Sequence, residues 1–152
     1  MTTIRRAVES DLPAIAGIQR ASPEAAQWSV SDYLGHDCWV ATVGDRLAGY
    51  LVCRAVAEDE REVLNIAVHP EFRRSGIARA LLEAECDRNL SYYFLEVRAS
   101  NKTARAFYSV MGFTEAGVRP AYYEDPPESG IVMKRRSCYR HNCQETASGR
   151  RV

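Results

Sequence analysis

The fold is decided by the stretch Leu64-Asn65-Ile66-Ala67-Val68-His69-Pro70-Glu71-Phe72-Arg73-Arg74-Ser75-Gly76-Ile77-Ala78-Arg79-Ala80-Leu81-Leu82. It opens with branched apolar residues, which favour a β-strand, and the pair His69-Pro70 stops that strand. After a short loop, apolar side chains return at helical spacing, at Ile77, Ala80, Leu81 and Ala84. Backbone amides at a helix N-terminus point outward with the positive end of the helix dipole. This strand–loop–helix unit therefore predicts an anion site.

The loop of this unit has the residue types that a phosphate site needs. Gly76 lets the backbone approach a phosphate closely, and the small side chain of Ala78 leaves that approach open. Arg74 and Arg79 can add charge-assisted hydrogen bonds. An isolated match of this kind is more often an ordinary turn with solvated arginines, so the assignment depends on the rest of the chain.

Outward from this unit, the alternation of apolar and turn residues predicts one α/β domain over residues 1–135. Strands are expected at residues 4–8, 38–43, 47–57, 62–68, 92–98, 113–119 and 130–135. Helices are expected after the capping residues Ser10 or Asp11, near Ser29, from Ile77 onward, and along residues 104–111, where Gly112 ends the last helix. The pattern indicates a mixed sheet in three layers. Residues 136–152 form a polar, basic tail that we expect to be disordered.

The five cysteines are scattered and odd in number: Cys38, Cys53, Cys86, Cys138 and Cys143. An oxidised, secreted protein usually has an even and clustered set, so we expect reduced thiols. The run Cys138-x-x-His141-x-Cys143 matches no standard zinc spacing and lacks an evident fourth ligand. No metal is therefore expected.

Charge and hydropathy restrict the partners. No apolar run is long enough to span a bilayer, and residues 1–6 lack the apolar core of a signal peptide. We therefore expect a cytoplasmic protein without a membrane partner. Residues 1–133 carry 14 basic and 19 acidic side chains, whereas from Lys134 onward six basic residues accompany one acid. An acidic body suits a basic or amino-terminal acceptor, and no nucleic acid is needed. RNA binding by the basic tail is a weaker alternative, because Tyr139 is its one aromatic residue.

A second informative stretch, Phe94-Leu95-Glu96-Val97-Arg98-Ala99-Ser100-Asn101, leads into the helix that Gly112 ends. If Leu95 and Val97 enter the core, Glu96 points to the other face of the sheet. Asn101 stands at the expected helix N-cap, where its side chain can bind backbone donors or a ligand amide. Tyr108 lies two helical turns further on, about 10 Å along the axis. Taken singly, Glu96 is more often a solvated strand residue and Tyr108 a core residue.

Together these motifs resemble the GNAT superfamily of N-acetyltransferases, whose acetyl-CoA pyrophosphate loop is read here as Arg73-Arg74-Ser75-Gly76-Ile77-Ala78. The resemblance covers nearly all of residues 3–134 and implies the GNAT fold, a mixed and mostly antiparallel sheet flanked by helices. It implies that acetyl-CoA binds along Ile66, Ala67 and Val68, where two sheet strands splay apart and the cofactor adds a short strand. In the loop and helix it implies contacts from Arg74, Ser75, Gly76, Ile77, Ala78 and Arg79.

Within that superfamily, the chain is similar to the RimI-type branch, the ribosomal-protein-alanine N-acetyltransferases. The hallmarks are Asn65-Ile66-Ala67-Val68, Leu95-Glu96-Val97-Arg98-Ala99-Ser100-Asn101, Tyr108-x-x-x-Gly112-Phe113 and Gly117-x-Arg119-x-x-Tyr122-Tyr123, with Trp28-Ser29 near the front. By this resemblance Glu96 is the general base, Tyr108 the general acid, and Asn101 a cofactor contact. Trp28, Tyr122 and Tyr123 are expected to line the acceptor groove. The implied reaction moves the acetyl group of acetyl-CoA to the N-terminal alanine of a small-subunit ribosomal protein, catalysed by a monomer or weak dimer.

Three departures from the family pattern leave the acceptor open. The run Pro127-Glu128-Ser129-Gly130 replaces the Glu-Asp-Ala run that usually precedes the last strand. Residues 82–94 are a few residues shorter than usual, and the tail after Arg136 has no family counterpart. A lysine side chain or a small-molecule amine is therefore an alternative acceptor. An alternative of another class is a non-catalytic module that senses acetyl-CoA, which predicts the loss of the acid or the base, yet Glu96 and Tyr108 are both present.

Overall fold

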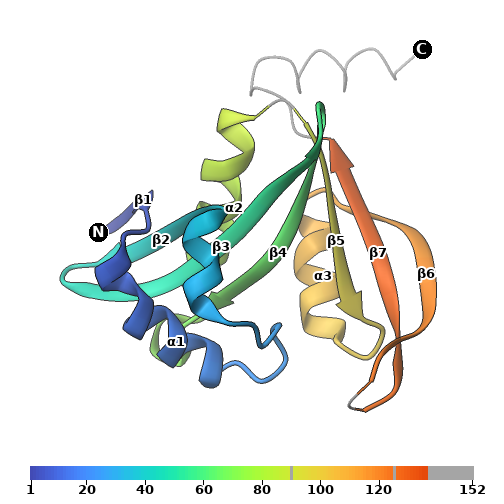
Figure 1. Cartoon of the computed structure of the whole chain (residues 1–152), viewed down its shortest axis with the longest axis horizontal. Coiled ribbons are helices and arrows are strands. Elements are labelled where there is room, and N and C mark those ends of the chain that lie inside the picture. Colours follow the sequence, from blue (N-terminus) through green and yellow to red (C-terminus); the bar gives the residue numbers. More distant parts are fainter. Residues whose placement is uncertain (90, 125, 137–152) are drawn as a thin grey trace.

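The computed structural model describes residues 1–89, 91–124 and 126–136, which form one seven-stranded sheet with helices on both faces (Figure 1). The strands are β1 (Thr2–Arg6), β2 (Asp37–Val43), β3 (Arg46–Ala57), β4 (Glu60–Val68), β5 (Tyr92–Arg98), β6 (Thr114–Tyr123) and β7 (Glu128–Arg136). The α-helices are α1 (Leu12–Arg20), α2 (Ile77–Arg88) and α3 (Lys102–Val110), and the 3-10 helices are η1 (Glu9–Asp11), η2 (Val30–Gly35) and η3 (Pro70–Phe72). The predicted order of elements is confirmed. The predictions about Cys138, His141, Cys143 and the rest of the tail lie outside the described residues.

The strand order is β1-β2-β3-β4-β5-β7-β6, and only the β4–β5 pair is parallel. This confirms the predicted mixed, mostly antiparallel sheet. None of the helices in the described part of the chain is long and apolar enough to cross a membrane.

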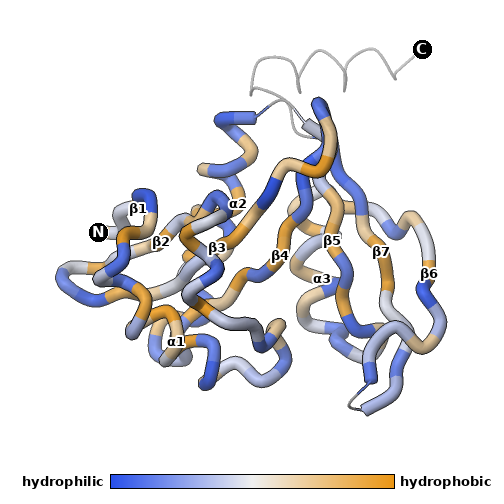
Figure 2. The backbone as a smooth tube through the Cα atoms, in the orientation of Figure 1, coloured by the Kyte–Doolittle hydropathy of each residue, from blue (hydrophilic) through white to orange (hydrophobic). Residues whose placement is uncertain are grey.

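Two apolar clusters on opposite faces of the sheet make the three layers. One cluster packs α1 and η2 against the sheet, with Ile15, Tyr33 and Tyr50 at its centre. The other packs α2 and α3 against the opposite face, with Leu81 and Tyr108 among its members. Figure 2 shows hydrophobic residues along the central strands and hydrophilic residues at the β2–β3 turn. The described thiols of Cys38, Cys53 and Cys86 are free and buried in these clusters, and burial raises the pKa of the Cys86 thiol to about 11.

Two local predictions need correction. The first strand ends at Arg6 rather than Val8, because the Val8 amide bonds to the Asp11 carboxylate (2.8 Å) and the chain turns into η1. Asp11 stands at the predicted N-cap position of α1, but its carboxylate does not bond to the amides of that helix. It binds the guanidinium of Arg5 instead, at 2.8 and 2.9 Å. The short helix expected near Ser29 is confirmed and is the 3-10 helix η2.

The sheet opens between its two parallel strands. β4 and β5 pair only over the three partners Glu60–Tyr92, Arg61–Tyr93 and Glu62–Phe94. Beyond these partners the strands diverge, as Figure 1 shows. α3 lies beside the opening, on the face of the sheet that α2 also covers. Among the described residues, β4 from Val63 to Val68 therefore has no strand partner on its β5 side. This splay is the feature that the sequence led us to expect.

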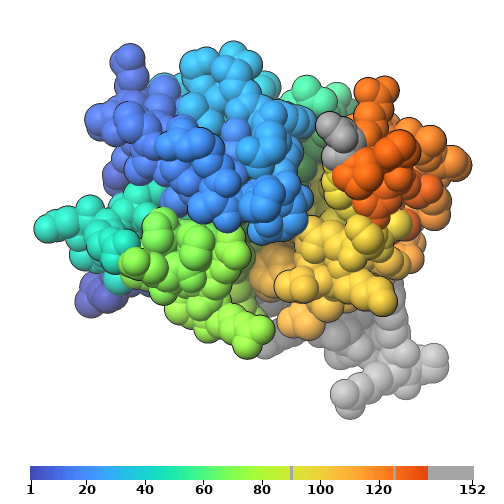
Figure 3. All heavy atoms as spheres, turned by 90° about the horizontal axis from the view of Figure 1, so that it is seen from below, coloured from blue at the N-terminus to red at the C-terminus, as the bar shows by residue number. Residues whose placement is uncertain are grey.

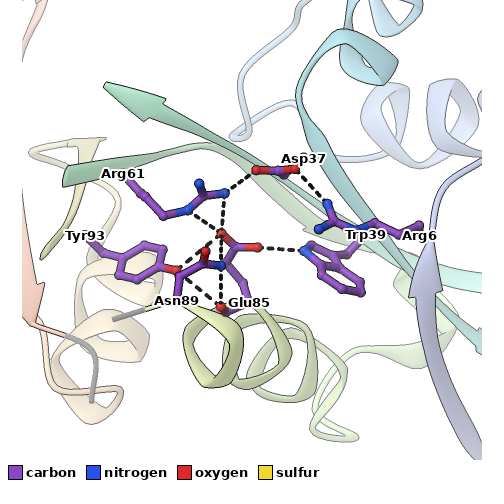
Figure 4. Close-up of polar contacts among 7 residues, drawn as sticks. All are labelled: Arg6, Asp37, Trp39, Arg61, Glu85, Asn89 and Tyr93. Atoms are coloured by element: carbon purple, nitrogen blue, oxygen red, sulfur yellow. Dashed lines mark hydrogen bonds and ion pairs between the residues drawn. The ribbon is translucent and has the colours of Figure 1, made fainter. Parts of the chain in front are cut away.

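A buried polar cluster sits where the splay begins (Figure 4). The carboxylate of Glu85, from α2, is fully buried and accepts hydrogen bonds from Arg61 Nε on β4 and Trp39 Nε1 on β2, both at 2.7 Å. The Tyr93 hydroxyl on β5 donates to the Glu85 carbonyl at 3.2 Å. Arg61 also pairs with Asp37. Because Arg61 and Tyr93 are strand partners, the cluster joins both strands to α2 at the start of the opening.

We predict that Arg61→Met destabilises the protein by about 3 kcal/mol or more, because it leaves the Glu85 carboxylate buried without its cation. Chemical denaturation followed by circular dichroism measures this loss. The matched control is Arg54→Met, because Arg54 pairs with Glu62 at 3.2 Å on the exposed surface. That exposed pair is expected to contribute less than about 1 kcal/mol. Equal effects of the two substitutions would contradict the assignment.

Candidate active site

The predicted anion loop runs from η3 to the first residue of α2. Gly76 is the N-cap of α2 and has φ +81°, a left-handed conformation that favours glycine. A Cβ added at Gly76 would meet no atom within 4 Å, so the space in front of the helix N-terminus is open. Arg74 also has a positive φ, of 61°, which bends the loop before the helix. The amides at the start of this twelve-residue helix therefore face open space, as an anion site requires.

The side chains of the loop divide into two groups. Arg74 and Ser75 are exposed, and Ala78 is half-buried. Arg79 is exposed and pairs with Glu83 one turn along the helix at 3.0 Å. Ile77 is different, because its side chain is 2% exposed and belongs to the core. Only the backbone of Ile77 can therefore contribute to an anion site.

The side of β4 that faces the splay is the second part of the site. Ile66, Ala67 and Val68 pair with β3 on one side, and their other backbone edge borders the opening. Gly49 on β3 allows this arrangement, because a Cβ there would lie 2.9 Å from the Ala67 carbonyl oxygen and 3.0 Å from Ile77. The strand and the anion loop are thus held close together.

Glu96 of β5 points away from the core that Leu95 and Val97 enter. Its side chain is 20% exposed, and Oε1 lies 3.0 Å from Nε of Arg119 on β6. Oε2 is buried and has no hydrogen-bond partner among the described residues. The carboxylate lines a cavity of about 250 Å³ together with Val56, Glu60, Glu62, Phe94, Leu95, Arg119 and Val132. A carboxylate with one unused oxygen at a cavity wall can accept a proton from a bound ammonium group.

Tyr108 lies on α3, in the apolar cluster that covers the opposite face of the sheet. It is 7% exposed, and its ring packs edge-on against Phe107 and Phe113, with ring centroids 5.3 and 5.5 Å away. Burial raises the pKa of Tyr108 above its ordinary value, so the hydroxyl stays protonated at neutral pH. Asn101 lies at the N-cap of the same helix, α3, where Oδ1 accepts a hydrogen bond from the Ala104 amide at 3.2 Å. Its predicted capping position is confirmed.

Tyr122 and Tyr123 lie at the end of β6, next to Glu96. Hydrogen bonding to Glu96 raises the pKa of Tyr122 above its ordinary value, and burial raises the pKa of Tyr123 to about 12. The two rings meet edge-on at 5.1 Å. Gly130 lies beneath them, since a Cβ there would sit 3.2 Å from Tyr122 Cδ1. A larger residue at position 130 would therefore press against both tyrosine rings.

Trp28 lies in the segment between α1 and η2. In Figure 3 the blue N-terminal segment and the orange-red β6–β7 end stand on either side of a hollow floored by the central strands. The Trp28 side chain is 47% exposed, and its carbonyl oxygen accepts a 2.6 Å hydrogen bond from Gln19. The structure thus brings Glu96, Tyr122 and Tyr123 together, and the N-terminal segment that contains Trp28 stands on the other side of the hollow.

Two arginines have contacts that sequence reasoning missed. Arg119 was part of a quoted motif, but its ion pair with Glu96 crosses the intervening strand β7. Arg73, counted as the first loop residue, turns its Nε to the Val68 carbonyl oxygen at 3.1 Å and its Nη2 to Ser22 Oγ at 3.1 Å. The contacts of Arg119 with Glu96 and of Arg73 with Ser22 join residues that are distant in the chain, so no local signal indicates them.

Comparisons with known proteins agree with this architecture. Residues 35–115 match the family described as the acetyltransferase (GNAT) domain. The ribosomal protein bS18-alanine N-acetyltransferase of Salmonella typhimurium is 38% identical, over 88% of this chain and 96% of its own length. The crystal structure of the ribosomal-protein-S18-alanine N-acetyltransferase from Escherichia coli superposes with a TM-score of 0.78, at 34% identity, over 90% of this chain and 94% of that one. Ard1 from Thermoplasma volcanium gives 0.81 at 26% identity, over 90% and 98%. The chain therefore belongs to the GNAT acetyltransferase family, within its RimI-type branch.

Proposed function

We propose that this N-acetyltransferase transfers the acetyl group of acetyl-CoA to the N-terminal amino group of a protein, the alanine of a small-subunit ribosomal protein. The observation that carries the proposal is the 38% identity, over nearly the full length of both chains, to an enzyme named for that acceptor. The acceptor groove is proposed to lie beside Glu96, where a carboxylate oxygen without a partner among the described residues borders a cavity. A cytoplasmic location and a monomeric or weakly dimeric state stay predictions.

The described residues fit acetyl-CoA as the acetyl donor, whose thioester supplies the group to be transferred. The α2 N-terminus, with Gly76 open in front of it, suits the pyrophosphate. Arg74, Ser75, Ala78 and Arg79 flank Gly76 in the chain and are proposed to contact the phosphates. The free edge of Ile66, Ala67 and Val68 can pair with an extended amide chain such as pantetheine, as a strand pairs with a sheet edge. Asn101 caps α3 through Oδ1, and its Nδ2 remains for a ligand carbonyl.

Glu96 is the proposed general base. An α-ammonium group has a pKa near 8, so it must lose a proton before its nitrogen can attack a carbonyl carbon. Oε2 of Glu96 is buried and has no hydrogen-bond partner in the described part of the chain, and it therefore has the capacity to take that proton directly or through a water molecule. Arg119 holds the other oxygen, which orients the carboxylate. The backbone amide of Val68 is proposed to polarise the thioester carbonyl.

Tyr108 is the proposed general acid. The thiolate that leaves on acyl transfer needs a proton, and a phenol that stays neutral at neutral pH can donate one. Burial keeps the Tyr108 hydroxyl in that form. Glu96 and Tyr108 approach the splay from opposite faces of the sheet, so the acceptor amine and the leaving sulfur can each meet one of them. No covalent enzyme intermediate is required, and the buried thiols of Cys53 and Cys86 have no part in the reaction.

Gly76→Asp is predicted to weaken acetyl-CoA binding by about tenfold to 100-fold. The new carboxylate would face the pyrophosphate at the helix N-terminus, and like charges repel. Isothermal titration calorimetry on the folded variant measures the change. Gly44→Asp is the matched control, because Gly44 also has a positive φ, of 59°, and open space around it, but lies in the β2–β3 turn. If both variants bind acetyl-CoA as the wild type does, the loop is not the phosphate site.

A panel of acceptors with acetyl-CoA tests the proposed function. The panel contains an alanine-initiated peptide with a free amino group, the same sequence blocked at its N-terminus and carrying an internal lysine, and small-molecule amines. We expect mass spectrometry to find one acetyl group on the free N-terminus only. Modification of the lysine peptide or of a small amine instead would overturn the acceptor and keep the enzyme class. Binding of acetyl-CoA without any transfer would favour the non-catalytic sensor.

A further inference from the structure

Four polar side chains lie buried between α1, η2 and the sheet, on the face opposite α2. They are Gln19, Tyr33, Tyr50 and Asn65, and none is more than 7% exposed. The Asn65 side-chain amide is at their centre, with Nδ2 3.0 Å from the hydroxyl oxygens of both Tyr33 and Tyr50. The Gln19 Oε1 accepts from the Tyr33 hydroxyl. A cluster of this kind, in a low-dielectric core, holds its members in one arrangement.

This cluster also holds a loop. The segment 21–29, which links α1 to η2 and carries Trp28, is mostly irregular. Asn65 Nδ2 lies 2.9 Å from the Ala26 carbonyl oxygen, and Gln19 Nε2 lies 2.6 Å from the Trp28 carbonyl oxygen. Both buried amide groups therefore donate to the backbone of segment 21–29. The path of that backbone around Trp28 is set by side chains from α1 and β4.

A second tether reaches the same segment from the anion loop. Arg73 Nη2 donates to Ser22 Oγ at 3.1 Å and to the Ala21 carbonyl oxygen at 3.3 Å, while its Nε donates to the Val68 carbonyl oxygen at 3.1 Å. Its guanidinium also lies 3.6 Å from the Glu24 carboxylate. Arg73 is 43% exposed in its side chain, so this tether is weaker than the buried one.

Both tethers start on elements assigned to acetyl-CoA. Asn65 directly precedes Ile66 on β4, and Arg73 directly precedes Arg74 in the loop. We propose that Asn65 is a positioning residue for the acceptor, which fastens segment 21–29 to the acetyl-CoA-binding strand as one wall of the acceptor groove. This inference rests on the proposed function. It adds a residue that touches neither substrate but sets where the acceptor lies relative to Glu96.

Asn65→Asp separates the tether from the packing. Aspartate has the same volume, and its carboxylate can still accept hydrogen bonds from the hydroxyl groups of Tyr33 and Tyr50. In its ionised form it cannot donate to the Ala26 carbonyl oxygen, and it repels that oxygen. Burial favours the protonated form, which can donate, so the assays are run above about pH 8 to favour the carboxylate. Tyr50→Phe is the matched control, because it removes a hydroxyl group from the same buried cluster. Among the described residues, that hydroxyl group bonds to Gln19 and Asn65 and makes no hydrogen bond to segment 21–29.

The experiment combines kinetics, calorimetry and fluorescence on the full chain. For Asn65→Asp we expect the KM for the alanine-initiated peptide to rise about tenfold, the worth of one buried hydrogen bond. The dissociation constant of acetyl-CoA and the kcat at saturating peptide should change less than threefold. Acrylamide should quench the exposed Trp28 more strongly in the variant, while the buried Trp39 stays protected. Tyr50→Phe should lower the melting temperature and leave KM and quenching as in the wild type.

Several results would overturn the proposal. An unchanged peptide KM in Asn65→Asp would do so, as would an equal rise in KM in Tyr50→Phe. If Asn65→Asp does not fold, Gln19→Leu is used, because it removes the hydrogen bond to the Trp28 carbonyl oxygen. An unchanged peptide KM in Gln19→Leu would also overturn the proposal. If the wild type acetylates another amine, the tether is tested by measuring the KM for that amine and the acrylamide quenching of Trp28 in the same variants. The failure of the proposed function is thereby kept apart from the failure of the tether.

Discussion

Glu96→Gln is expected to lower kcat by roughly 10²–10⁴-fold, the usual worth of a positioned general base. Glutamine keeps the shape of the side chain and can still meet Arg119 through its oxygen, but it cannot take a proton. Acetyl-CoA affinity should barely change, because Glu96 lies on the acceptor side of the splay. Steady-state kinetics with the alanine-initiated peptide measure kcat, and calorimetry measures the affinity.

The pH dependence of Glu96→Gln gives a second, independent signature. Activity of the variant should recover in part as pH rises through about 8, because more of the acceptor amine is then neutral in solution. Glu62→Gln is the matched control, since Glu62 lines the same cavity and pairs with Arg54 on the surface. A wild-type kcat in Glu96→Gln would mean that this carboxylate is only a solvated strand residue.

Tyr108→Phe is expected to lower kcat by a similar factor, roughly 10²–10⁴-fold, because it keeps the aromatic packing and removes the donated proton. The variant should fold normally, since the ring contacts with Phe107 and Phe113 remain. Raising the pH should not rescue it, because neutral acceptor amine does not replace the acid. In the wild type, the raised pKa of Tyr108 predicts no loss of this acid below about pH 10.

Tyr93→Phe is the control for Tyr108→Phe. Tyr93 is also a buried tyrosine of the core beside α2 and α3, but its hydroxyl donates to Glu85 at the start of the splay. Its loss should cost stability and leave kcat within a few-fold of the wild type. Equal kcat losses in both variants would indicate that buried tyrosine hydroxyl groups stabilise this core and that Tyr108 has no acid role.

Local sequence patterns predict most elements well because their causes are local. β5 was expected at residues 92–98 and is observed at Tyr92–Arg98, with Leu95 and Val97 buried and Glu96 on the other face. The turn at Gly44 and the helix end at Gly112 both have positive φ, as their glycines predict. Residues of one strand or turn carry the information for that element, so no knowledge of the remaining chain is needed.

The prediction of strand ends is less accurate where hydrogen bonds to a partner strand decide where a strand stops. β6 was expected to stop at residue 119, but the structure extends it to Tyr123. An irregularity between Arg119 and Tyr123 takes up Pro120 and Ala121, with φ +52° at Ala121, and pairing with β7 resumes at Tyr123–Glu128. The partner strand supplies the hydrogen bonds that extend β6, and local propensity does not include them.

The sequence by itself determined the family, the splay strand with its Gly76 loop, and the candidates Glu96 and Tyr108. Only the tertiary structure decided what these residues meet. The Arg119–Glu96 ion pair depends on the order β5-β7-β6, and the tethers from Asn65 and Arg73 to segment 21–29 join residues 39 and 51 positions apart. Such contacts follow from strand order, register and face, and a shift of one residue in register reverses every side chain of a strand. Those quantities are set by the packing of the whole chain.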